Sequence, residues 1–207
     1  MTKVLIVEDD PMAQSLMELF VKNSGRYELA ACIESAAFAL SYCMQNRVDL
    51  ILMDVCTALD ASGLMEAAKI KARLPDIKII IVTSQPECDF IQRARMGSVD
   101  SFWYKTPREG EMLGVMDRTM AGEHIYPDTT PEVMVGGLSS REFTARELEV
   151  LRELLTGDSN AQIAERLGIS EKNVRNYVSS MMAKTGLDTR TKLAVAADRS
   201  GIVNKDF

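Results

Sequence analysis

The sequence has no long hydrophobic run, few aromatic residues, a single histidine and no excess of positive charge. No stretch approaches the roughly 18 consecutive apolar residues that a membrane-spanning helix needs. A strand pattern begins at the N-terminus, so we expect no secretory signal. The net charge of −6 argues against a chain that coats nucleic acid along its whole length, but it does not exclude one small basic face. We therefore expect a cytoplasmic protein with no membrane partner.

The sequence also lacks the cysteine spacing of a metal site or of a disulfide framework. Its four cysteines all fall in the first half of the chain, at Cys32, Cys43, Cys56 and Cys88. Free thiols in a reducing compartment are the expected state.

Two hydrophobic periods alternate over residues 1–121. Short apolar runs typical of strands occur at 4–7, 28–33, 50–53, 77–82 and 101–104. Amphipathic segments typical of helices follow at 11–24, 35–46, 63–73, 87–96 and 109–121. Five strands that alternate with five helices predict an α/β domain, a doubly wound parallel five-stranded sheet with helices on both faces.

The alternation stops after Ala121. Residues 122–138 contain proline, glycine, serine and threonine without a sustained period, so we expect a linker, in which His124 is solvated. From Thr144 onward the period is helical only, which predicts an all-α domain at 139–207 with helices at 144–156, 159–167, 171–185 and 189–200. A glycine follows each of these helices, where a helix should end: Gly157, Gly168, Gly186 and Gly201.

Three consecutive carboxylates, Glu8, Asp9 and Asp10, follow the first predicted strand. Asp10 precedes Pro11, a pair typical of a helix N-cap and the first helical residue, and that role removes Asp10 from the cluster. Asp54 follows the third strand. Because the carboxyl ends of parallel strands meet at one edge of an open sheet, Glu8, Asp9 and Asp54 converge if the first and third strands are neighbours.

Carboxylates held this close repel one another, by roughly 3 kcal/mol for two of them about 5 Å apart at an effective dielectric constant near 20. The site must therefore raise a pKa, recruit a lysine or bind a cation. Oxygen ligands at a water-accessible strand end suit Mg²⁺. Lys105 after the fifth strand adds a cation, and Thr83 after the fourth adds a hydroxyl that can donate to an oxyanion. A carboxylate in such surroundings can accept a phosphoryl group.

These residues, at four strand ends in this order, resemble the receiver domain of two-component response regulators over residues 1–121. The resemblance implies a flavodoxin-like fold and phosphotransfer to Asp54 from a sensor histidine kinase. It implies a switch made of Thr83, Phe102 and Lys105. It also implies Mg²⁺ coordination by Asp9, Asp54 and the backbone carbonyl of Cys56, with Glu8 acting through water.

The segment after Asp54 departs from the receiver pattern. Receivers usually have Met-Pro there and reach a glycine eight residues after the acceptor, whereas this chain has Thr57-Ala58 and reaches Gly63 one residue late. We expect a longer and more mobile loop, which affects the lifetime of the phosphoryl group and the choice of kinase more than the acceptor. Asp60 in this loop is expected to be a solvated turn residue.

The C-terminal helices have apolar stripes at helical spacing, and a short turn at 168–170 joins the second helix to the third. The polar face of the third helix carries Lys172, Asn173, Arg175, Asn176 and Ser179, with Lys184 beyond them. Arginine and asparagine on the second helix of a helix-turn-helix can read bases in the DNA major groove, and lysine can contact phosphates. The alternative for a bare helix pair is a bundle with a solvated charged face.

The segment 139–203 closely resembles the LuxR-type helix-turn-helix of NarL/FixJ-type regulators. The matching pattern comprises Arg146-Glu147, Val150-Leu151, Ser159-Asn160, Ile163-Ala164, Leu167, Ile169-Ser170, Val174-Arg175, Lys184 and Arg190. The resemblance implies that Arg175, Asn176 and Ser179 contact base edges of double-stranded DNA and that Lys172, Asn173 and Lys184 contact phosphates. It also implies a homodimer through the last helix, on an inverted repeat spaced about one DNA turn.

Together the two halves predict a DNA-binding transcriptional regulator that is not an enzyme. Mg²⁺-dependent phosphorylation of Asp54 would turn Phe102 inward and promote dimerisation and promoter binding. Two alternatives stay open. One is a regulator that binds DNA without phosphorylation, which the altered 57–63 loop supports. The other is a Mg²⁺-dependent phosphohydrolase with Asp54 as nucleophile, although the domain has no insertion long enough for a substrate cap.

Overall fold

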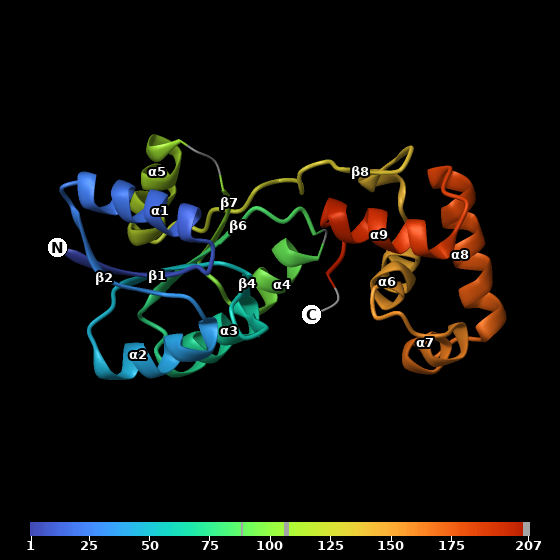
Figure 1. The fold of residues 1–207 in the computed structure, drawn as a ribbon. Helices are drawn as coiled ribbons and strands as arrows, with labels where there is room; N and C mark the ends of the chain where they lie inside the picture. The colour runs from blue at the N-terminus through green and yellow to red at the C-terminus, as the bar shows by residue number, and fades with distance from the viewer. Residues whose placement is uncertain (88, 106–107, 205–207) are drawn as a thin grey trace. The chain divides into compact units, whose positions relative to one another are not determined.

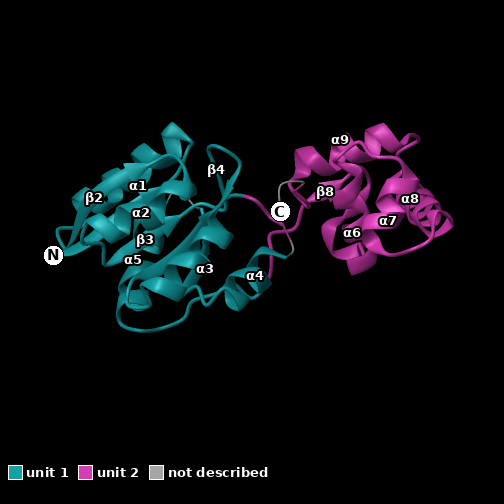
Figure 2. Cartoon of the chain, turned by 90° about the horizontal axis from the view of Figure 1, so that it is seen from below, with its two compact units in different colours: residues 1–84, 89–128 teal, residues 85–88, 129–207 magenta. Residues whose placement is uncertain are grey.

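The computed structural model describes residues 1–87, 89–105 and 108–204. The predicted free thiol of Cys88 therefore lies outside the described residues. The chain divides into two compact units (Figure 2). The first contains Met1–Ser84 and Asp89–Asp128, and the second contains Gln85–Cys88 and Thr129–Phe207.

A five-stranded parallel sheet forms the centre of the first unit. It is built from β1 (Thr2–Val7), β2 (Tyr27–Ile33), β3 (Leu50–Met53), β6 (Lys78–Thr83) and β7 (Ser101–Tyr104). The strand order is β2-β1-β3-β6-β7, and every neighbouring pair is parallel. The three inner strands are almost entirely buried because their apolar runs meet helices on both faces. The predicted fold class is confirmed.

Helices cover the two faces of this sheet (Figure 1). The helices are α1 (Pro11–Asn23), α2 (Ala39–Gln45), α3 (Gly63–Arg73), α4 (Phe90–Met96) and α5 (Glu109–Met120). On one face, α1 and α5 bury Phe20 and Met116 against alternate strand residues such as Ile6 and Leu52. Asp10 caps α1 as predicted, because its carboxylate accepts the Ala13 N–H at 2.7 Å.

Several elements differ from the predicted ones in detail. A 3₁₀ turn, η1 (Ala36–Phe38), precedes α2, and α4 begins at Phe90 rather than at residue 87. The loop that we expected to be longer and more mobile forms a short hairpin, β4 (Cys56–Thr57) with β5 (Ala61–Ser62), and its mobility stays a prediction. Its three-residue turn is formed by Ala58, Leu59 and Asp60, and the last two adopt left-handed φ values of 65° and 52°. The Thr57 hydroxyl donates to the Ala61 carbonyl at 2.7 Å.

The chain after α5 lies along the outer edge of β7. We call residues 124–126 the strap. The strap's backbone makes two hydrogen bonds to β7: the Phe102 N–H donates to the Ile125 carbonyl (2.7 Å), and the Ile125 N–H donates to Ser101 Oγ (3.1 Å). Its side chains make two more to the residues before β7. These join His124 Nδ1 to the Asp100 carbonyl (2.8 Å) and the Tyr126 hydroxyl to the Val99 carbonyl (2.6 Å). The first part of the predicted 122–138 linker thus packs on the first unit.

The second unit is mainly helical. A short hairpin, β8 (Met134–Val135) with β9 (Leu138–Ser139), and a 3₁₀ turn, η2 (Ser140–Glu142), precede the helices α6 (Ala145–Leu154), α7 (Asn160–Leu167), α8 (Glu171–Thr185) and α9 (Arg190–Ser200). Side chains of Thr144, Ser159 and Ser170 cap the first three helices. Gly168, Gly186 and Gly201 end α7, α8 and α9 with left-handed φ values. The four predicted helices are confirmed.

One apolar core holds these four helices together. Val150, Ile163, Val178 and Leu193, from α6, α7, α8 and α9 in turn, are buried in it. Over the described part of the chain, no helix combines the length and the apolar character needed to cross a membrane.

Candidate functional site

The carboxyl ends of the strands bring the predicted acidic residues together. Glu8 and Asp9 follow β1 and Asp54 follows β3, and these strands are neighbours in the sheet. One carboxylate oxygen from each of the three lies within 4.8 Å of the other two. Glu8 and Asp54 are buried, with 1% and 8% of their surface exposed, whereas Asp9 is open to solvent. The predicted convergence of these three side chains is confirmed.

Lys105, directly after β7, joins the two buried carboxylates. Its Nζ lies 2.6 Å from Glu8 Oε2 and 2.9 Å from Asp54 Oδ2. The other carboxylate oxygen of Asp54 accepts the Val55 N–H at 2.7 Å. The amine therefore fixes the relative position of two side chains that come from different strands.

Burial dominates the electrostatics of the pocket. It raises the pKa of Asp54, although Lys105 opposes this rise. Burial, and then the neighbouring charge of Asp54, raise the pKa of Glu8 to about 7. Burial alone would lower the pKa of Lys105, but Asp54 and Glu8 more than offset it, so that the pKa of the amine is raised. One ammonium cannot neutralise three carboxylates, and oxygen donors with an excess of negative charge fit Mg²⁺. The backbone of Cys56 lies two residues beyond Asp54, in β4.

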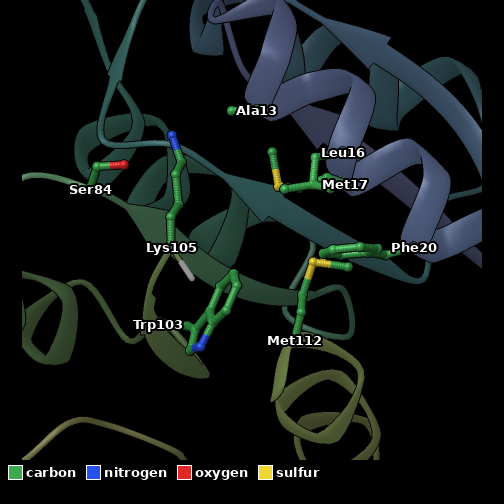
Figure 3. Close-up of a pocket in the computed structure, with 8 residues that line it drawn as sticks. All are labelled: Ala13, Leu16, Met17, Phe20, Ser84, Trp103, Lys105 and Met112. Carbon is green, nitrogen blue, oxygen red and sulfur yellow. The ribbon is translucent and has the colours of Figure 1, made fainter. Parts of the chain in front are cut away.

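An apolar pocket of about 230 Å³ adjoins Lys105 between α1 and α5 (Figure 3). It is lined by Ala13, Leu16, Met17, Phe20, Ser84, Trp103, Lys105 and Met112. Its lining is mostly apolar, so few protein groups on this side compete with the carboxylates for the amine.

The two other predicted switch residues are already buried. Thr83, 1% exposed at the end of β6, hydrogen-bonds the Asp54 carboxylate. Phe102, also 1% exposed, packs edge-to-face on Tyr104 with ring centroids 5.1 Å apart. We expected phosphorylation to turn Phe102 inward. In this structure the ring is buried, and the effect of phosphorylation on it stays a prediction.

Gly63 is a part of the site whose role the sequence did not reveal. A Cβ on Gly63 would lie 1.8 Å from the Asp54 carbonyl oxygen, so that only glycine fits. Its N–H donates to the Val55 carbonyl at 2.8 Å. The β4–β5 hairpin therefore absorbs the extra residue of the loop and returns the chain to the backbone of Asp54. The only signal in the sequence was the late position of this glycine.

The helix-turn-helix in the second unit consists of α7, the turn at 168–170 and α8. Val174, Val178 and Met181 of α8 face the core. The opposite face exposes the predicted DNA-contacting residues Lys172, Asn173, Arg175, Asn176 and Ser179. The guanidinium of Arg175 lies 3.0 Å from Glu171, in a solvent-exposed pair that costs little to break.

Lys184 differs from the other residues of this predicted surface. Its Nζ donates to both carboxylate oxygens of Glu147, at 2.8 and 3.0 Å, and Glu147 is buried. Glu147 also accepts the N–H of Thr144, the N-cap of α6. Two of the three N–H donors of Lys184 thus tie α8 to the start of α6.

Comparison with known proteins agrees with this geometry. The model of the response regulator receiver domain matches residues 4–117, more than half of the chain.

The chain belongs to the response regulators.

A second model, that of the bacterial regulatory proteins of the LuxR family, matches residues 141–197. The response regulator therefore combines a receiver domain with a LuxR-type DNA-binding domain, the arrangement of NarL/FixJ-type transcription regulators.

Similar proteins extend over both domains. The response regulator protein VraR of Staphylococcus aureus (strain Mu3) is 29% identical, over 97% of this chain and 98% of VraR. Two solved structures have the same fold. RcsB from Salmonella enterica serovar Typhimurium, bound to the promoter rprA in the presence of phosphomimetic BeF₃⁻, has a TM-score of 0.60 at 17% identity, over 95% of this chain and 98% of RcsB. The response regulator ChrA of a heme-sensing two-component system has a TM-score of 0.52 at 18% identity, over 97% and 98% of the two chains.

Proposed function

We propose that a sensor histidine kinase phosphorylates Asp54 of this response regulator and that the modification controls promoter binding in the cytoplasm. The observation that carries the proposal is the joint contact of the buried Asp54 carboxylate with Lys105 and Thr83. An oxygen of Asp54 would attack the phosphorus of a phosphohistidine, so that a P–O bond forms as the P–N bond breaks and the histidine leaves. Lys105 and Thr83 would then hold the oxygens of the transferred group.

Glu8, Asp9, Asp54 and the Cys56 carbonyl are the groups that would hold Mg²⁺. When bound, the ion supplies positive charge that stabilises the phosphoryl oxygens during transfer. The raised pKa of Glu8 suits this role, because a site that disfavours an extra negative charge gains most from a divalent cation.

Labelling tests the acceptor directly. With acetyl phosphate and Mg²⁺, we expect the wild-type protein to be phosphorylated and Asp54→Ala to remain unlabelled with its fold intact by circular dichroism. Asp9→Asn, which keeps the acceptor but weakens the proposed metal site, should be labelled more slowly. Undiminished labelling of Asp54→Ala would assign the phosphoryl group to another residue.

We further propose that α8 reads double-stranded DNA, with Arg175, Asn176 and Ser179 at base edges. Lys172, Asn173 and Lys184 would contact phosphates, and the third N–H of Lys184 is the one left for that purpose. Two copies joined through α9 would read an inverted repeat. Arg175→Ala should weaken specific binding by about 1–3 kcal/mol, whereas Lys69→Ala, which removes an exposed charge from α3, should not. Unchanged affinity of Arg175→Ala in a gel-shift titration would show that DNA binds to a surface other than the exposed face of α8.

One observation favours a second candidate, a regulator that binds DNA without phosphorylation. The loop after Asp54 departs from the receiver pattern and forms the β4–β5 hairpin beside the acceptor. Comparing the DNA affinity of the unphosphorylated and phosphorylated protein separates the two candidates. A ratio near one, together with full binding by Asp54→Ala, would establish the second.

A further inference from the structure

The first unit has a polar pocket at the opposite end of β7 from the acidic site. The pocket measures about 500 Å³ and is lined by Arg95, Ser98, Val99, His124 and Tyr126. Val99 and Asp100 precede β7, whereas Lys105 follows it, so the strand separates this pocket from the carboxylates around Asp54. Two lining residues belong to the end of α4 and the turn after it, and two belong to the strap.

Among the lining residues, Arg95 carries a positive charge and none carries a negative one. The guanidinium of Arg95 lies 4.4 Å from the centre of the Tyr126 ring, which holds it in place without neutralising it. Within the described part of the chain, Arg95 forms no ion pair. The neighbouring acid, Asp100, is buried and occupied by Lys71 and Lys78, each 2.9 Å away. The guanidinium of Arg95 is therefore available to pair with an anionic ligand.

Ser98 and His124 are two polar residues of the pocket lining. Ser98 has a φ of 56°, a left-handed conformation that is costly for a residue with a side chain, and its N–H donates to the Arg95 carbonyl at 3.2 Å. His124 Nδ1 faces the Asp100 carbonyl at 2.8 Å and must carry the hydrogen there, because a carbonyl only accepts.

We propose that this pocket binds a small molecule through a phosphate group. A phosphate monoester has only acceptor oxygens and up to two negative charges, which match the guanidinium of Arg95 and the Ser98 hydroxyl. The volume lies within the range of small-molecule sites, roughly 300–1,000 Å³. Because His124 and Tyr126 are strap residues, an occupied pocket holds the strap on β7 and with it the hydrogen bond from the Phe102 N–H to Ile125.

His124 is the only histidine of the chain, so its imidazole ¹H–¹³C resonance reports on the pocket without assignment. The full-length protein is titrated with inorganic phosphate, without Mg²⁺, at fixed pH and ionic strength. We expect a saturable shift of the resonance and slower hydrogen exchange of the Phe102 amide. Acetate is titrated in a parallel experiment and should shift the resonance at least tenfold less effectively.

Three variants sharpen this experiment. Arg95→Gln should raise the apparent phosphate dissociation constant at least tenfold, whereas Arg73→Gln, which removes an exposed charge outside the pocket, should leave it unchanged. Ser98→Gly removes the hydroxyl at a φ that suits glycine, so it should weaken binding while the fold is kept. A linear drift without saturation, equal saturation in Arg95→Gln and wild type, or equal affinity for acetate would each overturn the proposal.

Discussion

A single amine organises the acidic site at the scale of residues. Lys105 reaches two buried carboxylates at once, and both contacts are short. The two acids differ from Asp9, which water solvates. Burial raises the pKa of both Glu8 and Asp54, so pH is the most direct probe of this arrangement.

Glu8 should make the protein less stable as the pH rises. Its pKa is raised from 4.5 to about 7 in the folded chain, so the folded state keeps a proton that the unfolded chain releases. This stabilisation is complete below pH 4.5 and is lost as the pH rises through about 7, which amounts to about 3 kcal/mol of unfolding free energy. Urea unfolding without Mg²⁺ at several pH values should show this decrease. Glu8→Gln should flatten it, and Glu28→Gln, on the exposed side of β2, should not.

Gly63→Ala tests the close approach to the acceptor. The new Cβ would overlap the Asp54 carbonyl, so we expect a loss of about 2–3 kcal/mol in unfolding free energy and slower labelling of Asp54. Gly110→Ala is the matched control, since nothing lies within 4 Å of its Cβ position; there alanine should stabilise α5 by at most about 1 kcal/mol. Equal stability of the two variants would contradict the observed geometry.

At the scale of elements, two buried contacts fix how one element packs against another. The β4–β5 hairpin brings Gly63 back to β3, and the Glu147–Lys184 pair ties α8 to the cap of α6. Burial alone would raise the pKa of Glu147, but hydrogen bonds from Lys184 and Thr144 hold it below its ordinary value. Helix α8 is thus positioned by charge as well as by its apolar face.

Lys184 and Lys172 should separate stability from DNA affinity. Lys184→Ala leaves a buried carboxylate with two fewer donors, so the unfolding free energy should drop by about 2 kcal/mol at pH 7. Because the pKa of Glu147 is lowered, this difference should shrink as the pH falls below the ordinary carboxyl range. Lys172→Ala should change stability by less than about 0.5 kcal/mol and should reduce the salt dependence of DNA binding by about one phosphate contact. Equal stability changes would contradict the assignment.

Much of this architecture follows from patterns that the sequence displays. Apolar runs and their spacing predicted five parallel strands and four C-terminal helices, because burial on both faces leaves a clear period. The convergence at Glu8, Asp9 and Asp54 followed from strand order alone. The β4–β5 hairpin was not predictable, since its turn places Leu59 and Asp60 where glycine or asparagine is usual. The inward Phe102 and the internal pairing of Lys184 depend on contacts between distant residues, which no local pattern encodes.

At the scale of the whole molecule, an acidic chain carries one exposed basic helix face. The net charge is −6, yet the exposed face of α8 presents Lys172 and Arg175. Binding to DNA must therefore be confined to a small surface, and the rest of the chain should repel the phosphate backbone. Such a protein should release non-target DNA readily at physiological salt.

The strap also shields the edge strand β7 from pairing with a second copy of the chain. An outer strand offers a row of unused N–H and C=O groups on which another chain can build a further strand. Residues 124–126 cover part of this edge, because the Ile125 carbonyl accepts the Phe102 N–H of β7 and the side chains of His124 and Tyr126 bond the Asp100 and Val99 carbonyls before it. A fragment that stops at residue 121 should therefore associate into large species in light scattering, whereas one that ends at residue 128 should stay dispersed. Equal dispersal of both would contradict this role. The first residues of the connector between the two domains thus shield an edge strand and keep the sheet from pairing with that of another molecule.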